Sequence, residues 1–144
     1  MTEETTVTSE DLKRYFTKDL FARYVGIELI DARDGWAKAR LTIEGHHLNG
    51  VRRVHGGAIF TLADLVFAAA ANSRGRVAVA INGSIQFIRA PKGPVLYAEA
   101  SEESRNHTLA SYSVKITDES GELISLFQGM AYRKGESVDY FENV

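Results

Sequence analysis

The chain has 144 residues, of which 17 are Lys or Arg and 19 are Asp or Glu, and it contains no Cys. This length suits one hydrophobic core, so we expect residues 1–144 to form a single domain whose core spans about 15–133. The net charge of -2 argues against a nucleic-acid partner, and the lack of Cys excludes disulfides, thiolate catalysis and cysteine metal sites.

The N-terminal segment, MTEETTVTSEDLKRYF, is polar and acidic. A signal peptide begins basic and then turns apolar, so this segment and the lack of Cys predict a cytoplasmic protein. Residues 1–8 are expected to fray, and Ser9 is a candidate N-cap for one helix through residues 10–26. Five apolar or aromatic residues recur there at helical spacing and predict one packed face: Leu12, Tyr15, Phe16, Leu20 and Tyr24.

A β-hairpin is predicted next. In WAKARLTI, residues 36–43, small or apolar residues alternate with polar ones, as in a half-buried strand. We expect residues 25–32 to pair with this strand through a turn at Asp34-Gly35. A polar loop, EGHHLNGVRR, leads from the hairpin to the next element.

The stretch from Ala58 to Ala71 has 14 residues, of which only Thr61 and Asp64 are polar. A bilayer span needs roughly 20 apolar residues, so we expect a buried helix and no membrane partner. Burying an unpaired carboxylate costs several kcal/mol. Asp64 is therefore expected to face solvent, to pair with a nearby Arg or Thr, or to be kept for chemistry.

Four strands are predicted after this helix. The first covers residues 77–87, where Gly83 indicates a bulge or a close backbone approach, and PKGP ends it. The others cover residues 95–103, 109–117 and 122–133, and the last is apolar on both faces, as in a central strand. The expected fold class is α+β: a hotdog fold, in which a curved antiparallel sheet of five to six strands wraps a long central helix, with an N-terminal helix in addition.

The start of the apolar helix is a candidate site. Its first N–H groups lack helical partners, and glycine at Gly56 and Gly57 lets a ligand approach them, as in an oxyanion hole. The alternative is a tight entry into the helix. Asp64 follows Gly57 by almost two turns, about 10 Å along the axis, so the two cannot serve one reacting atom within one chain. If both act, two antiparallel copies of the helix in a dimer share each site.

Other candidates are weaker. Asn49 lies in the loop before the helix, where it can orient a reacting group or simply form a turn with Gly50. The three histidines at 46, 47 and 55 match no ligand spacing with Asp64, so no metal is expected. The sequence has no GxSxG, GxGxxG or GxxxxGK motif, which argues against a serine hydrolase and a phosphate-binding loop.

One stretch carries a family resemblance. It reads LNGVRRVHGGAIFTLADLVFAAAANSRG and then AVAINGSIQFIRA, so that Asn, five residues, His-Gly-Gly and Leu-Ala-Asp stand in one unbroken frame. Here the chain closely resembles the hotdog-fold acyl-CoA thioesterases of the phenylacetate-degradation (PaaI-like) family, and the element order agrees over roughly residues 15–133. The resemblance implies a thioester hydrolase that acts on acyl-CoA without a cofactor, as a homodimer with shared active sites that pairs into a homotetramer.

The resemblance also implies roles for single residues. Asp64 is the catalytic carboxylate, Gly56 offers its N–H to the thioester carbonyl, Asn49 helps to position the reacting groups, and His55 assists from the helix start. Some relatives carry a water-positioning Ser in the next strand, where this chain has Ala80 or a neighbour. Asn82 or Ser84 are the possible substitutes.

The remaining candidates bind the substrate. Gly57, Thr61 and Phe60 lie on the helix, and an apolar, partly aromatic acyl pocket is expected from Phe60, Leu65, Phe67, Ile81 and Phe87. The pocket and the resemblance favour an aryl-acetyl group, such as phenylacetyl or its ring-hydroxylated forms, over a medium-length straight chain. Three basic residues near strand ends are candidates for the coenzyme A phosphates: Arg89, Lys92 and Arg105.

Two other functions stay open from sequence. A hotdog dehydratase usually pairs a His with its acid, and the apolar helix has none beside Asp64. A non-catalytic acyl-CoA sensor would use the same pocket and usually adds a DNA-binding segment. Neither the acidic N-terminus nor the net charge of this chain indicates such a segment.

Overall fold

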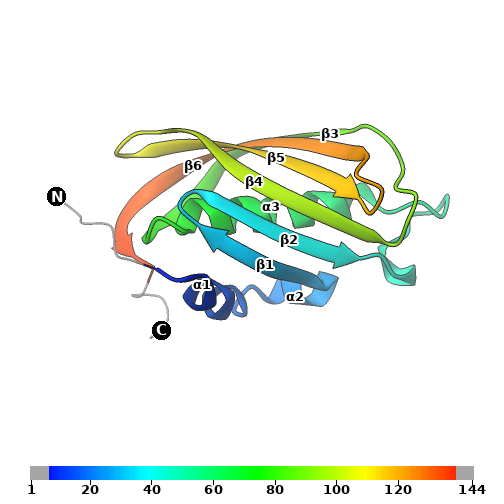
Figure 1. Ribbon diagram of the computed structural model, residues 1–144, viewed down its shortest axis with the longest axis horizontal. Helices are drawn as coiled ribbons and strands as arrows, with labels where there is room; N and C mark the ends of the chain where they lie inside the picture. Colours follow the sequence, from blue (N-terminus) through cyan, green and yellow to red (C-terminus); the bar gives the residue numbers. More distant parts are fainter. Residues whose placement is uncertain (1–6, 139–144) are drawn as a thin grey trace.

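The computed structural model describes residues 7–138, in which a curved sheet wraps around one long helix (Figure 1). The elements in chain order are α1 (Ser9–Phe16), α2 (Leu20–Val25), β1 (Ile27–Arg33), β2 (Trp36–Thr42), the short 3-10 helix η1 (Gly45–His47), α3 (Gly56–Asn72), β3 (Arg76–Phe87), β4 (Val95–Arg105), β5 (Leu109–Asp118) and β6 (Leu123–Ser137). No helix in this part of the chain is long and apolar enough to cross a membrane.

The six strands form one antiparallel sheet in the order β1-β2-β4-β5-β6-β3. The strands wrap around α3, and the short helices α1 and α2 lie beside β1 (Figure 1). This is the predicted α+β layout, with six strands and a central helix. The last strand, β6, lies between β5 and β3, which confirms its prediction as a central strand.

The N-terminal prediction of one helix is wrong, because two helices form. The first is capped by Thr8, not by Ser9, in a capping box with Asp11. Asp19 then accepts a hydrogen bond from the Ala22 N–H and starts α2, so the helical periodicity does not continue across the break. The expected shared face is lost as a result: Leu12 is fully buried, whereas Leu20 and Tyr24 of α2 are 71% and 80% exposed.

The predicted hairpin is confirmed. Arg33 pairs with Trp36, which leaves Asp34 and Gly35 as a two-residue loop with φ of 50° and 79°. Positive φ at both central positions matches the right-handed twist of the flanking strands, and Asp-Gly is a favoured pair for it.

The core lies between α3 and the concave face of the sheet. Leu62 and Val66 of α3 are fully buried, and alanines on the facing strands let the helix come close: Ala37, Ala39, Ala98 and Ala100. At Gly83 a Cβ would lie 3.1 Å from the Phe127 ring, so this glycine permits a close approach. The irregularities in the pairing of β3 fall elsewhere, between Arg76 and Ala78 and between Ala80 and Asn82.

Strand β3 forms an edge of the sheet. Its apolar residues share one parity, yet Val79, Ile81 and Phe87 are 40%, 55% and 56% exposed. An edge strand of 12 residues with several exposed apolar side chains is a template for pairing with another strand.

Candidate active site

The start of α3 offers one free backbone donor. His55 caps the helix, because its Nδ1 accepts a hydrogen bond of 2.8 Å from the Gly57 N–H. The carbonyl of His55 accepts from the Ala58 and Ile59 N–H groups. Among residues 7–138 the Gly56 N–H has no hydrogen-bond partner. It lies at the positive end of the dipole of a 17-residue helix and is free to donate to a ligand atom.

Access to Gly56 depends on its lack of a side chain. A Cβ on this residue would lie 3.0 Å from Cζ of Phe87, which is tighter than an ordinary contact. The Phe87 ring thus lies beside the free Gly56 N–H. Because this ring is about half exposed, it has room to move.

Asp64 belongs to the small exposed part of α3. It follows Gly57 by seven residues and Thr61 by three, so the three share one side of the helix. Within the described chain the Asp64 carboxylate makes no hydrogen bond or ion pair, whereas the Thr61 hydroxyl donates to the Gly57 carbonyl at 2.7 Å. Of the alternatives left open by the sequence, pairing with Arg or Thr is therefore not observed.

The protein environment raises the pKa of Asp64 above its ordinary value. The larger cause is partial burial, which disfavours the charged form, and the second is the negative charge of Asp19 at the start of α2. An exposed carboxylate without a counter-ion and with a raised pKa is suited to act as a base or a nucleophile.

Helix α2 and η1 flank the same side of α3 and leave an apolar hollow of about 220 Å³. It is lined by Phe21, Tyr24, Val25, His46, His47, His55, Gly57, Ala58 and Thr61. Three predicted site residues, His55, Gly57 and Thr61, thus meet in one place, one helical turn from Asp64. Phe21 and Tyr24 were not predicted as site residues, because the sequence gives no sign that α2 turns against the start of α3.

Buried His47 holds this hollow together. Its Nδ1 accepts from the Glu44 N–H at 2.8 Å, so its Nε2 carries the proton and donates to the Val25 carbonyl at 2.6 Å. The His47 carbonyl accepts from the His55 N–H at 2.7 Å. His47 thereby ties the end of α2 to the start of α3. In the described part of the chain no three His, Cys, Asp or Glu residues cluster as metal ligands.

The side-chain oxygen of Asn49 is used by its own loop. It accepts hydrogen bonds from the Val51 and Arg53 N–H groups at 3.0 and 3.1 Å. This is the turn-forming role that the sequence left open as the alternative to a catalytic one.

Two members of the predicted acyl pocket lie in the core of the chain. Leu65 and Phe67 are 4% and 1% exposed and belong to the core. Phe60 is partly exposed but packs edge-on against Phe127, with ring centroids 5.5 Å apart. The sequence did not reveal the burial of Leu65 and Phe67, because a helix that is apolar all round does not show which of its faces the sheet covers.

Asn82 and Ser84, both predicted to bind substrate, face away from α3. Gly83 pairs with Gly129, which in turn pairs with Tyr112, and Tyr112 is buried against the inner face of the sheet. Because neighbouring residues of a strand point to opposite faces, Asn82 and Ser84 point to the outer face. There they line a shallow hollow of about 270 Å³ with Ser111, Gln128, Gly129 and Met130.

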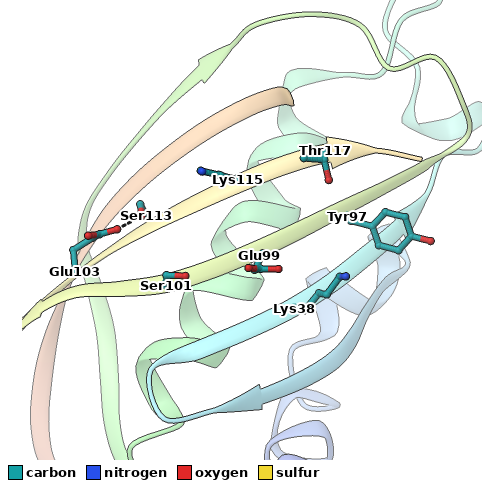
Figure 2. A pocket seen from close by; sticks show the side chains of 8 residues that line it. All are labelled: Lys38, Tyr97, Glu99, Ser101, Glu103, Ser113, Lys115 and Thr117. Atoms are coloured by element: carbon teal, nitrogen blue, oxygen red, sulfur yellow. Dashed lines mark hydrogen bonds between the residues drawn. The ribbon is translucent and has the colours of Figure 1, made fainter. Parts of the chain in front are cut away.

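A larger hollow, of about 370 Å³, also lies on the outer face (Figure 2). Lys38, Glu99 and Lys115 form one row across β2, β4 and β5, because Glu99 pairs with both lysines. The remaining lining residues are Tyr97, Ser101, Glu103, Ser113 and Thr117. This polar, charge-balanced surface is separated from α3 by the whole sheet and does not suit an acyl group.

The three predicted phosphate-binding residues do not form one cluster. Arg89 and Lys92 both contact Glu122, at 3.8 and 3.1 Å. Arg105 contacts Glu102 at 3.3 Å at the other end of β4, an 11-residue strand about 35 Å long at roughly 3.3 Å per residue. Arg52 and Arg53, which were not among the predicted residues, line a separate hollow of about 320 Å³ beside the loop into α3.

A curved antiparallel sheet around a long helix defines a hotdog protein, and the free donor and carboxylate on that helix define a candidate hydrolytic site. Residues 52–125 match the family model of the thioesterase superfamily. The chain therefore belongs to this superfamily, as a PaaI-like hotdog thioesterase, and is a thioester hydrolase.

Individual relatives agree with this assignment. Acyl-coenzyme A thioesterase PaaI of Escherichia coli is 33% identical over 124 residues, 85% of this chain and 89% of the relative. A protein of Archaeoglobus fulgidus is 36% identical over 129 residues, 88% of this chain and 84% of its own. The solved structure of E. coli PaaI, from the phenylacetic acid degradation operon, superposes with a TM-score of 0.83 over 91% of this chain and 99% of that one, at 30% identity.

Proposed function

We propose that this thioesterase hydrolyses acyl-CoA on the exposed side of α3, with Asp64 as the catalytic carboxylate. The observation that carries the proposal is an exposed acid that has no partner within residues 7–138, on a mostly buried apolar helix, with its pKa raised by its surroundings. The name of the E. coli relative, acyl-coenzyme A thioesterase, supplies the substrate class.

The chemistry needs few groups. Attack on the thioester carbonyl puts negative charge on its oxygen, and the free Gly56 N–H at the positive end of α3 stabilises it. The Gly57 N–H is already bonded to His55, so His55 contributes by shaping the helix start. The thiol leaves as a thiolate, whose ordinary pKa of about 8.5 makes a general acid unnecessary. Asp64 acts either as the nucleophile or as the base that activates water, and both roles need its ionised form.

The active site is proposed to be shared between two chains. Asp64 lies about 10 Å along the helix axis from Gly57. This is too far for the Asp64 carboxylate and the start of α3 in one chain to act on the same carbonyl group. The exposed apolar side chains of the β3 edge, Val79, Ile81 and Phe87, support a dimer in which two β3 edges meet and bring two copies of α3 together. A further pairing into a tetramer is part of the same proposal.

The acyl group is proposed to be apolar and aromatic, of the aryl-acetyl class. The hollow between α2 and α3 supports this, because the aromatic residues Phe21 and Tyr24 line it together with Thr61, which lies one helical turn from Asp64. Its volume of about 220 Å³ exceeds the roughly 150 Å³ of an apolar cavity that accepts benzene. Medium-length straight chains are the competing substrates.

A panel of acyl-CoA thioesters tests the substrate class. We expect phenylacetyl-CoA and ring-hydroxylated phenylacetyl-CoA to have a higher kcat/KM than hexanoyl-CoA or octanoyl-CoA. A straight chain that exceeds every aryl thioester by tenfold, about 1.4 kcal/mol in the transition state, would refute the aromatic class and leave the thioesterase function standing.

A further inference from the structure

The loop of residues 48–54, just before α3, presents two arginines beside a hollow. The hollow of about 320 Å³ lies between this loop and the loop that joins β3 to β4, and its floor is apolar. Its lining residues are Ile43, Leu48, Arg52, Arg53, Val54, Ala90, Pro91, Gly93 and Pro94. Within residues 7–138, neither arginine side chain contacts a carboxylate, so both guanidinium groups are available to a ligand.

The loop is built to hold these arginines in place. Asn49 exchanges backbone hydrogen bonds with Arg52 and Arg53, at 3.0 and 2.7 Å, while its side chain binds the Val51 and Arg53 N–H groups. Leu48 and Val54 close the loop as an isolated bridge. Arg52 has a φ of 60°, a conformation that costs energy for a residue other than glycine. These bonds fix the backbone of the loop on which the two exposed arginines stand.

The charges around the hollow favour an anion. Arg89 and Lys92 belong to the neighbouring loop and share one acid, Glu122. Asp118 accepts hydrogen bonds from Lys92, Ser120 and Glu122. Glu119 lies close to Gly93 but is not among the residues that line the hollow. The two unpaired arginines are therefore the charges that face the hollow itself.

We propose that this hollow binds the phosphate-bearing end of coenzyme A through Arg52 and Arg53, a subsite that rests on the proposed acyl-CoA thioesterase function. Guanidinium groups bind phosphate oxygens in pairs, and the apolar floor suits the adenine ring or the pantetheine arm. From Arg53 to Gly56 the backbone spans at most about 11 Å, so a ligand anchored by the arginines lies beside the loop that leads to the free Gly56 donor. Asn49 acts in this subsite as a positioning residue.

The test compares two thioesters of the same acyl group, acyl-CoA and acyl-pantetheine, of which only the first carries phosphates. For the double variant Arg52→Ala/Arg53→Ala we expect KM for acyl-CoA to rise at least about tenfold at low salt, with kcat within about twofold, because charged hydrogen bonds to phosphate are lost. Kinetics on acyl-pantetheine should not change. The rise should shrink as salt screens the charges.

Controls separate the possible explanations. Arg40→Ala removes an exposed arginine that pairs with Glu28 on the first hairpin, and it should leave both substrates unaffected. Arg52→Lys/Arg53→Lys keeps the charge and should recover part of the loss. Equal changes on both thioesters, or none on either, would overturn the proposal.

Two further measurements complete the test. Thioesters of dephospho-CoA show whether the 3′-phosphate or the diphosphate meets the arginines: the fold-change persists if the diphosphate does and disappears if the 3′-phosphate does. If the wild type hydrolyses neither acyl-CoA nor acyl-pantetheine, the proposed function fails. In that case the subsite is tested by calorimetry. We then expect the double variant to bind CoA about tenfold more weakly than the wild type, and to bind pantetheine as the wild type does.

Discussion

Replacing Asp64 by Asn removes a charge and keeps the shape of the side chain. Because the carboxylate has no partner among the described residues, the substitution breaks no hydrogen bond or ion pair. If Asp64 is the catalytic carboxylate, kcat should fall at least about 10²-fold, or about 2.7 kcal/mol, the lower end of what a positioned base contributes.

The same variant should not lose stability. The folded state raises the pKa of Asp64, so between the unfolded and folded pKa values the folded chain binds more protons than the unfolded chain. The free energy of unfolding therefore falls as pH rises through that window, and the cost persists at neutral pH. Asp64→Asn removes this cost, and we expect its free energy of unfolding at pH 7 to equal or slightly exceed that of the wild type.

The assay measures thiol release at several pH values together with urea unfolding. In the wild type, kcat/KM should rise with pH through a pKa above the ordinary value of an aspartate, as Asp64 ionises. Asp31→Asn is the matched control: its pKa is lowered, first by a hydrogen bond from Ser9, so this variant should keep its activity and lose stability at neutral pH. An Asp64→Asn variant that retains full kcat on the best substrate, or that unfolds, would refute the reasoning.

Three further outcomes are expected. Gly56→Ala should lower kcat about tenfold with little change in Tm, because its methyl group meets the movable Phe87 ring and fills the approach to the free N–H; an unchanged kcat would remove this donor from the mechanism. Ile81→Glu should give an inactive monomer by light scattering, because a charge on an exposed β3 edge prevents edge pairing; an active monomer would contradict the shared site. Phe21→Ala should lower kcat/KM for phenylacetyl-CoA at least about fivefold, whereas Leu20→Ala, equally exposed but outside the hollow, should not; equal effects of both would refute the acyl site.

The arrangement around α3 was predictable because few physical rules decide it. A run that is apolar on all sides has to be surrounded, and alternating strands that flank it supply a sheet to surround it. The cost of burying a lone carboxylate likewise limited Asp64 to a few alternatives, and the structure leaves it exposed and without a partner in the described chain. The hairpin turn followed from the φ values that Asp34-Gly35 tolerates.

The wrong predictions concern places where a single helix cap or strand irregularity changes which residues face the core in the segment that follows. The cap at Asp19 restarts the helix in a new direction, so the face expected from Leu12 onwards does not extend to Tyr24. The irregularity between Ala80 and Asn82 interrupts the alternation of inward and outward side chains along β3. A shift of one residue moves the side chains that follow to the opposite face of the sheet. Hollows such as the one beside Arg52 form between segments distant in sequence, so spacing along the chain carries no signal for them.

Steady turnover of acyl-CoA tests the central claim most directly. The purified protein is mixed with phenylacetyl-CoA in large excess, and free CoA thiol and free acid are counted per chain over time. We predict many equivalents of both products per chain, released in equal amounts at a constant rate that depends on Asp64. Saturable binding of the thioester with no more than one thiol released per chain would instead define a sensor and contradict the account.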